Sequence, residues 1–137
     1  MSVPVNDKIE SLIPDFYRWP RSWKGMAEDV PVGEELVAAF EPFLLTLIDS
    51  GLKKKTIRRH ADNLWVLGGE IVRTIAMEPR TSQTVSQVLA ESVGPEGGIY
   101  CRHLREESEI RSYDSTCRKL WKYLQTAEES DKTKHRG

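Results

Sequence analysis

One short segment gathers cationic side chains at a spacing that suits anion binding. From Gly51 to His60 the chain reads Gly-Leu-Lys-Lys-Lys-Thr-Ile-Arg-Arg-His, a tight turn followed by the first turns of a helix. Such a helix start carries free backbone N–H groups and the positive end of the helix dipole, both of which attract phosphate. The candidate DNA-contacting residues are Lys53, Lys54, Lys55, Thr56, Arg58 and Arg59. Contacts of this kind position DNA without reading its sequence.

The distribution of charge favours the same interpretation. Residues 51–80 carry a net charge of +4, whereas residues 1–50 carry −5 and the whole chain −1. A basic segment in a nearly neutral protein indicates an anionic partner for that segment. The alternative is that these cations only solvate the helix start and that Arg58 pairs with Asp62 one turn further on.

Signatures of catalysis are missing from the sequence. It contains no glycine-rich phosphate loop, no Gly-x-Ser-x-Gly, no His-Glu-x-x-His and no Cys-x-x-Cys. Cys101 and His103 could share a metal ion, but no second pair completes a zinc shell. His60 falls at the edge of an apolar helix face, where a role at the edge of the core is the better interpretation. We expect a protein that is no enzyme and needs no cofactor, metal or small-molecule substrate.

Length and composition predict one folded domain. The chain has 137 residues, of which 39% are hydrophobic and 30% charged. No apolar run approaches the roughly 18 residues that cross a membrane, and the N-terminus lacks the pattern of a signal peptide. Two cysteines, Cys101 and Cys117, fit reduced thiols better than a disulfide framework. We therefore expect a cytoplasmic protein without a membrane partner.

Apolar periodicity predicts four main helices, over residues 33–50, 54–77, 83–92 and 107–126. Pro42 should kink the first helix or start a new one. Gly51 should end the first segment by adopting a left-handed conformation. Gly68 falls on the buried stripe of the second helix, which indicates the close approach of another helix backbone or, alternatively, a kink.

The ends of the chain differ from this helical body. Several prolines predict an irregular arm over residues 1–30, with a short helical turn near residues 7–13. Phe16, Tyr17, Trp19 and Trp23 should pin this arm onto the body, the alternative being an exposed aromatic patch. We expect the helical domain to span residues 31–126 and residues 127–137 to form a flexible polar tail.

Two stretches carry a resemblance to a known family. Phe-Leu-Leu-Thr-Leu-Ile-Asp-Ser-Gly-Leu-Lys-Lys-Lys-Thr-Ile-Arg-Arg-His-Ala-Asp-Asn-Leu (residues 43–64) resembles the first helical hairpin of the core-binding domain of tyrosine recombinases, the phage integrases. Ser-Thr-Cys-Arg-Lys-Leu-Trp-Lys-Tyr-Leu (residues 115–124) is similar to the last helix of that domain. The resemblance covers about residues 35–125. It implies an all-α fold, a SAM-like orthogonal bundle of about four main helices that forms one arm of a DNA clamp.

The resemblance also implies which residues face DNA and which activity is missing. It places Lys53 to Thr56 against the nucleic acid, with Arg58 and Arg59 just beyond. Lys53 stands where the family favours a serine cap, so this helix start lacks a side-chain acceptor. Nothing after residue 126 resembles the catalytic domain of the family, and we therefore expect no recombination.

Two functional hypotheses follow from the sequence. The first is a non-catalytic DNA-binding or DNA-associated accessory protein that contacts double-stranded DNA through the basic segment. The second is a protein–protein interaction module, either a homodimer or the partner of a separately encoded protein. Complete burial of Trp19, Trp23, Trp65 and Trp121 would favour the first hypothesis, and an exposed tryptophan cluster would favour the second.

Overall fold

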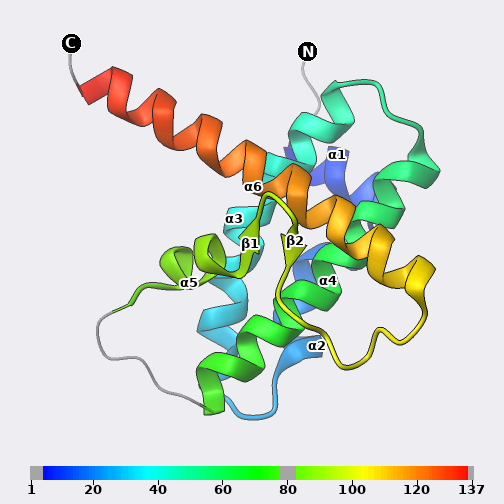
Figure 1. Cartoon of the computed structure of the whole chain (residues 1–137), viewed down its shortest axis with the longest axis vertical. Helices are drawn as coiled ribbons and strands as arrows, with labels where there is room; N and C mark the ends of the chain where they lie inside the picture. Colours follow the sequence, from blue (N-terminus) through cyan, green and yellow to red (C-terminus); the bar gives the residue numbers. More distant parts are fainter. Residues whose placement is uncertain (1–4, 78–82, 136–137) are drawn as a thin grey trace.

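The computed structural model of the chain is almost entirely helical (Figure 1), which confirms the predicted all-α class. It describes residues 5–77 and 83–135, with side chains described for residues 7–77 and 83–127. The helical elements are α1 (Val5–Leu12), the 3₁₀ helix η1 (Phe16–Arg18), α2 (Trp19–Trp23), α3 (Asp29–Asp49), α4 (Lys54–Met77), α5 (Val85–Ser92) and α6 (Glu107–His135). A two-residue antiparallel hairpin, β1 (Val93–Gly94) with β2 (Gly97–Gly98), links α5 to α6.

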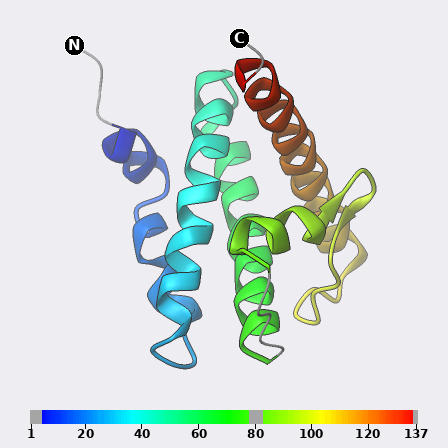
Figure 2. The ribbon, with the colours of Figure 1, turned by 90° about the vertical axis from the view of Figure 1, so that its left-hand side faces the viewer.

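Helices α3 and α4 lie side by side at the centre of the molecule (Figure 2). The N-terminal helices α1 and α2 cover one side of this pair, and α6 with the hairpin covers the other. One hydrophobic core runs through all of these layers and includes Phe16, Leu36, Phe40, Leu64 and Leu120.

Helix α3 is longer and less interrupted than the sequence indicated. It begins at Asp29, whose buried carboxylate accepts hydrogen bonds from the backbone N–H groups of Gly25 and Met26, at 2.8 and 2.9 Å. It continues through Pro42, so of the two alternatives for this proline, a kink or the start of a new helix, the second is wrong. Pro42 is exposed, and water can therefore satisfy the carbonyl that loses its partner. Gly51, with φ +84°, follows α3 in the left-handed conformation that was predicted.

Helix α4 has the predicted bounds and includes Gly68 without a break. A Cβ on Gly68 would lie only 2.4 Å from Cζ2 of Trp23, and one on Gly69 would lie 3.3 Å from Cδ1 of the same ring. The close approach that we attributed to a helix backbone is therefore made by an indole ring. The two glycines form the flat surface on which Trp23 packs.

The N-terminal arm is not irregular, as its prolines had suggested, but consists of α1, η1 and α2. Pro14 lies between two of these elements and Pro20 in the first turn of α2, where a proline removes no helical hydrogen bond. Phe16 and Trp19 are buried and meet edge to face, with 4.8 Å between ring centroids. This burial confirms that aromatic side chains hold the arm on the helical body.

The C-terminal region also departs from the sequence-based expectation. Helix α6 continues to His135 instead of ending near residue 126, and only residues 136–137 of the expected tail lie outside the described part of the chain. Residues 93–98, which lie between two predicted helices, form the small hairpin, in which Gly98 packs against Cys117 of α6. Thr84 and Gln87 form a reciprocal capping box at the start of α5.

Candidate nucleic-acid interface

The start of α4 forms an open depression on the protein surface. Its volume is about 770 Å³, and Lys54, Lys55, Thr56, Arg58, Arg59 and Asp62 line it. Five of the six candidate contact residues therefore surround one hollow, and only Lys53 lies outside its wall. Because this is the first turn of a 24-residue helix, unbonded backbone N–H groups point out of the same end.

The cations of this depression have no anionic partner among the residues that the structure describes. The ion pairs within the described residues join Lys8 to Asp49 and Glu70 to Arg73, so the alternative in which Arg58 pairs with Asp62 is not observed. Asp62 is the one carboxylate in the lining, against four cationic side chains. Burial, and then the nearby Asp15 carboxylate, raise the pKa of Asp62. The depression keeps a net positive charge.

Arg58 is held in place by the N-terminal arm. Its Nε donates a hydrogen bond to the backbone carbonyl of Leu12, the last residue of α1, at 3.1 Å. A helix C-terminus carries unsatisfied carbonyls and a partial negative charge, so it suits a guanidinium group. This contact fixes one nitrogen of Arg58 and leaves the others for a ligand. Sequence reasoning missed it because the two residues are 46 positions apart.

Arg59 is held from the other side by α6. Its Nη1 donates to the hydroxyl of Ser112 at 2.9 Å and lies 3.4 Å from that of Ser115. Both partners are neutral, so the positive charge of Arg59 is not cancelled. Helix α6 thus orients a cation of α4 without neutralising it.

A buried polar junction next to Arg59 fixes the two helices against each other. Asn63 donates to the carbonyl of Ser112 at 3.1 Å and to Oγ1 of Thr116 at 2.9 Å. His60 Nδ1 lies 2.7 Å from the same Thr116 oxygen. His60 is only 1% exposed, so it is buried more deeply than the edge position that the sequence predicted. Burial, and then the charges of Arg59 and Lys119, lower its pKa to about 4, so this imidazole is neutral.

Sequence reasoning overlooked a second group of cations on α6. Arg111, Arg118, Lys119 and Lys122 are all exposed. They lie seven, one and three residues apart, which places them with Ser115 on one broad side of the helix. Because Ser115 is the residue that Arg59 approaches, this stripe adjoins the depression. The helical spacing of these cations could have been detected in the sequence. The acidic residues 106, 107 and 109, which precede them, lower the net charge of the segment and obscured it.

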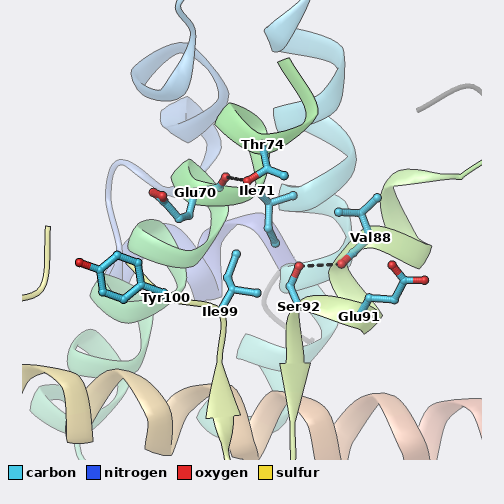
Figure 3. A pocket seen from close by; sticks show the side chains of 8 residues that line it. All are labelled: Glu70, Ile71, Thr74, Val88, Glu91, Ser92, Ile99 and Tyr100. Atoms are coloured by element: carbon cyan, nitrogen blue, oxygen red, sulfur yellow. Dashed lines mark hydrogen bonds between the residues drawn. The ribbon is translucent and has the colours of Figure 1, made fainter. Parts of the chain in front are cut away.

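The pocket between α4, α5 and the segment after β2 is a weaker candidate (Figure 3). The hydroxyl groups of Thr74 and Ser92 are already used, because Thr74 donates to the carbonyl of Glu70 and Ser92 to that of Val88. The side chains of Glu70 and Glu91 lie on opposite sides of it. No set of polar groups therefore converges on a ligand in this pocket.

The two cysteine thiols do not supply a nucleophile. Both are buried, with Cys101 before α6 and Cys117 on it. Burial raises the pKa of Cys117 to about 12 and also raises that of Cys101. A thiol needs a lowered pKa to react as a thiolate near neutral pH. The described residues also contain no group of three or more histidine, cysteine or acidic side chains able to hold a metal ion.

The four tryptophans match neither of the two expected outcomes. Trp19 is buried, and Trp23 and Trp121 are half-buried. Trp65, at 42% exposed, lies beside Trp23 at the wall of a surface groove. The tryptophans are thus not all buried, and they do not form an exposed cluster either.

Comparison with known proteins returned no match to any family model, curated protein or solved structure. The likeness to integrase core-binding domains therefore stays a prediction, and the function must be argued from the residues of this chain. Within residues 5–77 and 83–135, no helix is long and apolar enough to cross a membrane.

Proposed function

We propose that this protein is a non-catalytic DNA-binding accessory protein that holds the phosphate backbone in the depression at the start of α4. The proposal rests on one observation, namely that no carboxylate of the described residues neutralises the cations of the depression. Lys54, Lys55, Arg58 and Arg59 share one hollow and have no carboxylate within ion-pair distance among the described residues. A helix start with free N–H groups completes the attraction for phosphate.

The surface around the depression is better suited to binding a long, multiply charged anion than a small one. The hollow is open, and the exposed cations Arg111, Arg118, Lys119 and Lys122 extend the positive surface along α6. A ligand with regularly spaced phosphates can contact both helices, whereas a single phosphate would contact only one. The resemblance to core-binding domains, which clamp DNA, agrees with this choice. No base-reading contact is part of the proposal, so we expect little sequence preference.

Fluorescence anisotropy with a labelled mixed-sequence duplex at low and moderate salt tests the proposal. The double variant Lys54→Glu/Lys55→Glu reverses two charges on exposed side chains that form no ion pair with the described part of the chain, so it should fold normally. The control Arg102→Glu/Arg105→Glu makes the same charge change at exposed residues of the segment before α6. We expect the first variant to lose more than about tenfold in affinity and the control to change much less.

Salt dependence provides a second readout. Each phosphate contact that is removed should reduce the slope of log K against log salt by about 0.9 for a duplex, so Lys54→Gln/Lys55→Gln should reduce it by about 2. Absence of binding at low salt would contradict the proposal. Equal losses in the Lys54/Lys55 variant and its control would also contradict it, because the effect would then reflect net charge alone.

A further inference from the structure

A groove lined by two indole rings continues the exposed face of α4 beyond the cationic depression. Its volume is about 410 Å³, and its wall includes Trp23, Trp65, Val66 and Gly69, with Arg73 at the same surface. Most of this wall is apolar. A tryptophan exposed beside a groove leaves apolar area in contact with water. Such an apolar surface is typical of a binding site.

Internal hydrogen bonds fix both rings. Trp23 Nε1 donates to the carbonyl of Trp65 at 3.0 Å, and Trp65 Nε1 donates to the hydroxyl of Ser22 at 2.9 Å. Trp23 also packs on the flat surface made by Gly68 and Gly69. The exposed part of Trp65 therefore offers a ligand an immobile apolar surface and no hydrogen-bond donor. A ligand that stacks on it need not immobilise the ring first.

The position of the groove relates it to the cations. Lys55 and Trp65 are ten residues apart on one helix, which corresponds to about 15 Å along its axis. Asp62, Val66, Gly69 and Arg73 follow Lys55 on the same side of α4 at intervals of three, four and seven residues, and this side is exposed at Lys55 and Asp62 and half-buried beyond them. A strand with its phosphates in the depression can therefore reach the groove within a few nucleotides.

We propose that the groove receives an unpaired base of single-stranded DNA whose phosphates lie in the cationic depression. This inference rests on the proposed DNA-binding function and adds the form of DNA that is preferred. Every base has an apolar face that stacks on an aromatic side chain, and such stacking tolerates any sequence. In a duplex the bases are stacked on one another and cannot enter a groove of the protein.

The charge around the groove favours this occupant over an apolar protein segment. Arg73 lies at its edge, and the four cations of the depression lie on the same helix face. Glu70 also lines the groove, 4.0 Å from Arg73, and offsets the charge of Arg73 there. The face as a whole stays positive, which complements a polyanion that carries aromatic bases.

The test compares a labelled mixed-sequence single strand with the blunt duplex of the same sequence, each titrated into the full-length protein. Trp65→Ala should weaken binding of the single strand by about 5- to 150-fold and leave duplex affinity within about twofold. Trp65→Phe keeps an aromatic ring and should retain most of the affinity. Tyr100→Ala is the matched control, since it removes an aromatic residue that is 81% exposed outside the groove, and it should change neither affinity.

The salt dependence separates stacking from charge. Trp65→Ala should lower single-strand affinity at every salt concentration without changing the slope, whereas Lys54→Gln should reduce the slope by about 0.7. The emission of Trp65 is the difference in indole fluorescence between the wild type and Trp65→Phe. The single strand should quench this emission, whereas the duplex should not.

Each outcome decides between the two proposals. If Trp65→Ala keeps its single-strand affinity while Lys54→Glu/Lys55→Glu loses affinity for both probes, the DNA-binding proposal stands and the groove proposal is overturned. The groove proposal is also overturned if Trp65→Ala weakens the binding of both probes equally, or if the single strand leaves the emission of Trp65 unchanged. In these cases a protein segment becomes the better candidate ligand for the groove. If the wild type binds neither probe, both proposals fail.

Discussion

His60 should make the stability of this protein depend strongly on pH. The imidazole is buried between α4 and α6, with Nδ1 bonded to Thr116 and no hydrogen-bond partner for Nε2 among the described residues. A proton on Nε2 would be a buried charge without an acceptor. The neighbouring charges of Arg59 and Lys119 would add repulsion to the cost of burial. Protonation of His60 is therefore strongly disfavoured in the folded state.

The size of the effect follows from the two pKa values. The pKa of His60 is 6.5 in a model peptide and about 4 in the folded protein. At pH 7 both states are neutral and the group contributes almost nothing. As the pH falls below 6.5, only the unfolded chain gains the proton, so stability is lost by about 1.4 kcal/mol per pH unit and levels off below pH 4. Between pH 7 and 5 the loss attributable to His60 should be about 2 kcal/mol.

Urea unfolding followed by circular dichroism at a series of pH values from 7 to 5 measures this loss. His60→Asn is the matched variant, because its amide nitrogen can occupy the place of Nδ1 and donate to Thr116 without titrating. The variant should be less stable than the wild type at pH 7, owing to its smaller side chain, but its stability should vary less with pH. Equal pH dependence in both proteins would refute the reasoning, since the acid sensitivity would then come from other groups.

Three further predictions concern particular contacts. Gly68→Ala should destabilise the protein by about 1–3 kcal/mol in urea unfolding, because its Cβ would lie 2.4 Å from the Trp23 ring. Gly69→Ala is the matched control and should cost less, since its Cβ would lie 3.3 Å away and helix propensity gains about 1 kcal/mol. Asp62→Asn removes the carboxylate that lines the depression and should tighten duplex binding about fivefold at low salt, as measured by anisotropy. Thr84→Ala removes the hydroxyl that caps α5 and should lower the melting temperature through a loss of about 1 kcal/mol.

The sequence predicted the elements whose signals are local. The bounds of α4 were correct because a glycine turn and a long apolar stripe mark them within one segment. The start of α3 was placed four residues too late because Pro31 was taken as a barrier. It occupies the first turn, where its missing N–H breaks no helical bond. The arm was called irregular for the same reason, although its prolines lie at positions that short helices tolerate.

The candidate site was predicted only in part, because its geometry depends on contacts between distant segments. The gathering of Lys54, Lys55, Arg58 and Arg59 follows from helical spacing alone. Nothing in the spacing indicates that Leu12 and Ser112 hold the two arginines, since tertiary packing decides which carbonyl or hydroxyl meets each guanidinium group. The partner of Gly68 was likewise wrong, because a glycine on a buried stripe reports a close approach but not the group that approaches.

These distant contacts tie the arm to both parts of the proposed interface. At the start of α4, the carbonyl of Leu12 orients Arg58 in the depression. Three turns further along, Trp23 packs on Gly68 and Gly69 and bonds to the backbone of Trp65. An arm that served only to cover the core would need the apolar burial of Phe16 and Trp19 but neither of these polar contacts. The arm and α4 therefore form one unit, in which the same segment that completes the core also positions the cation and the ring that we assign to DNA.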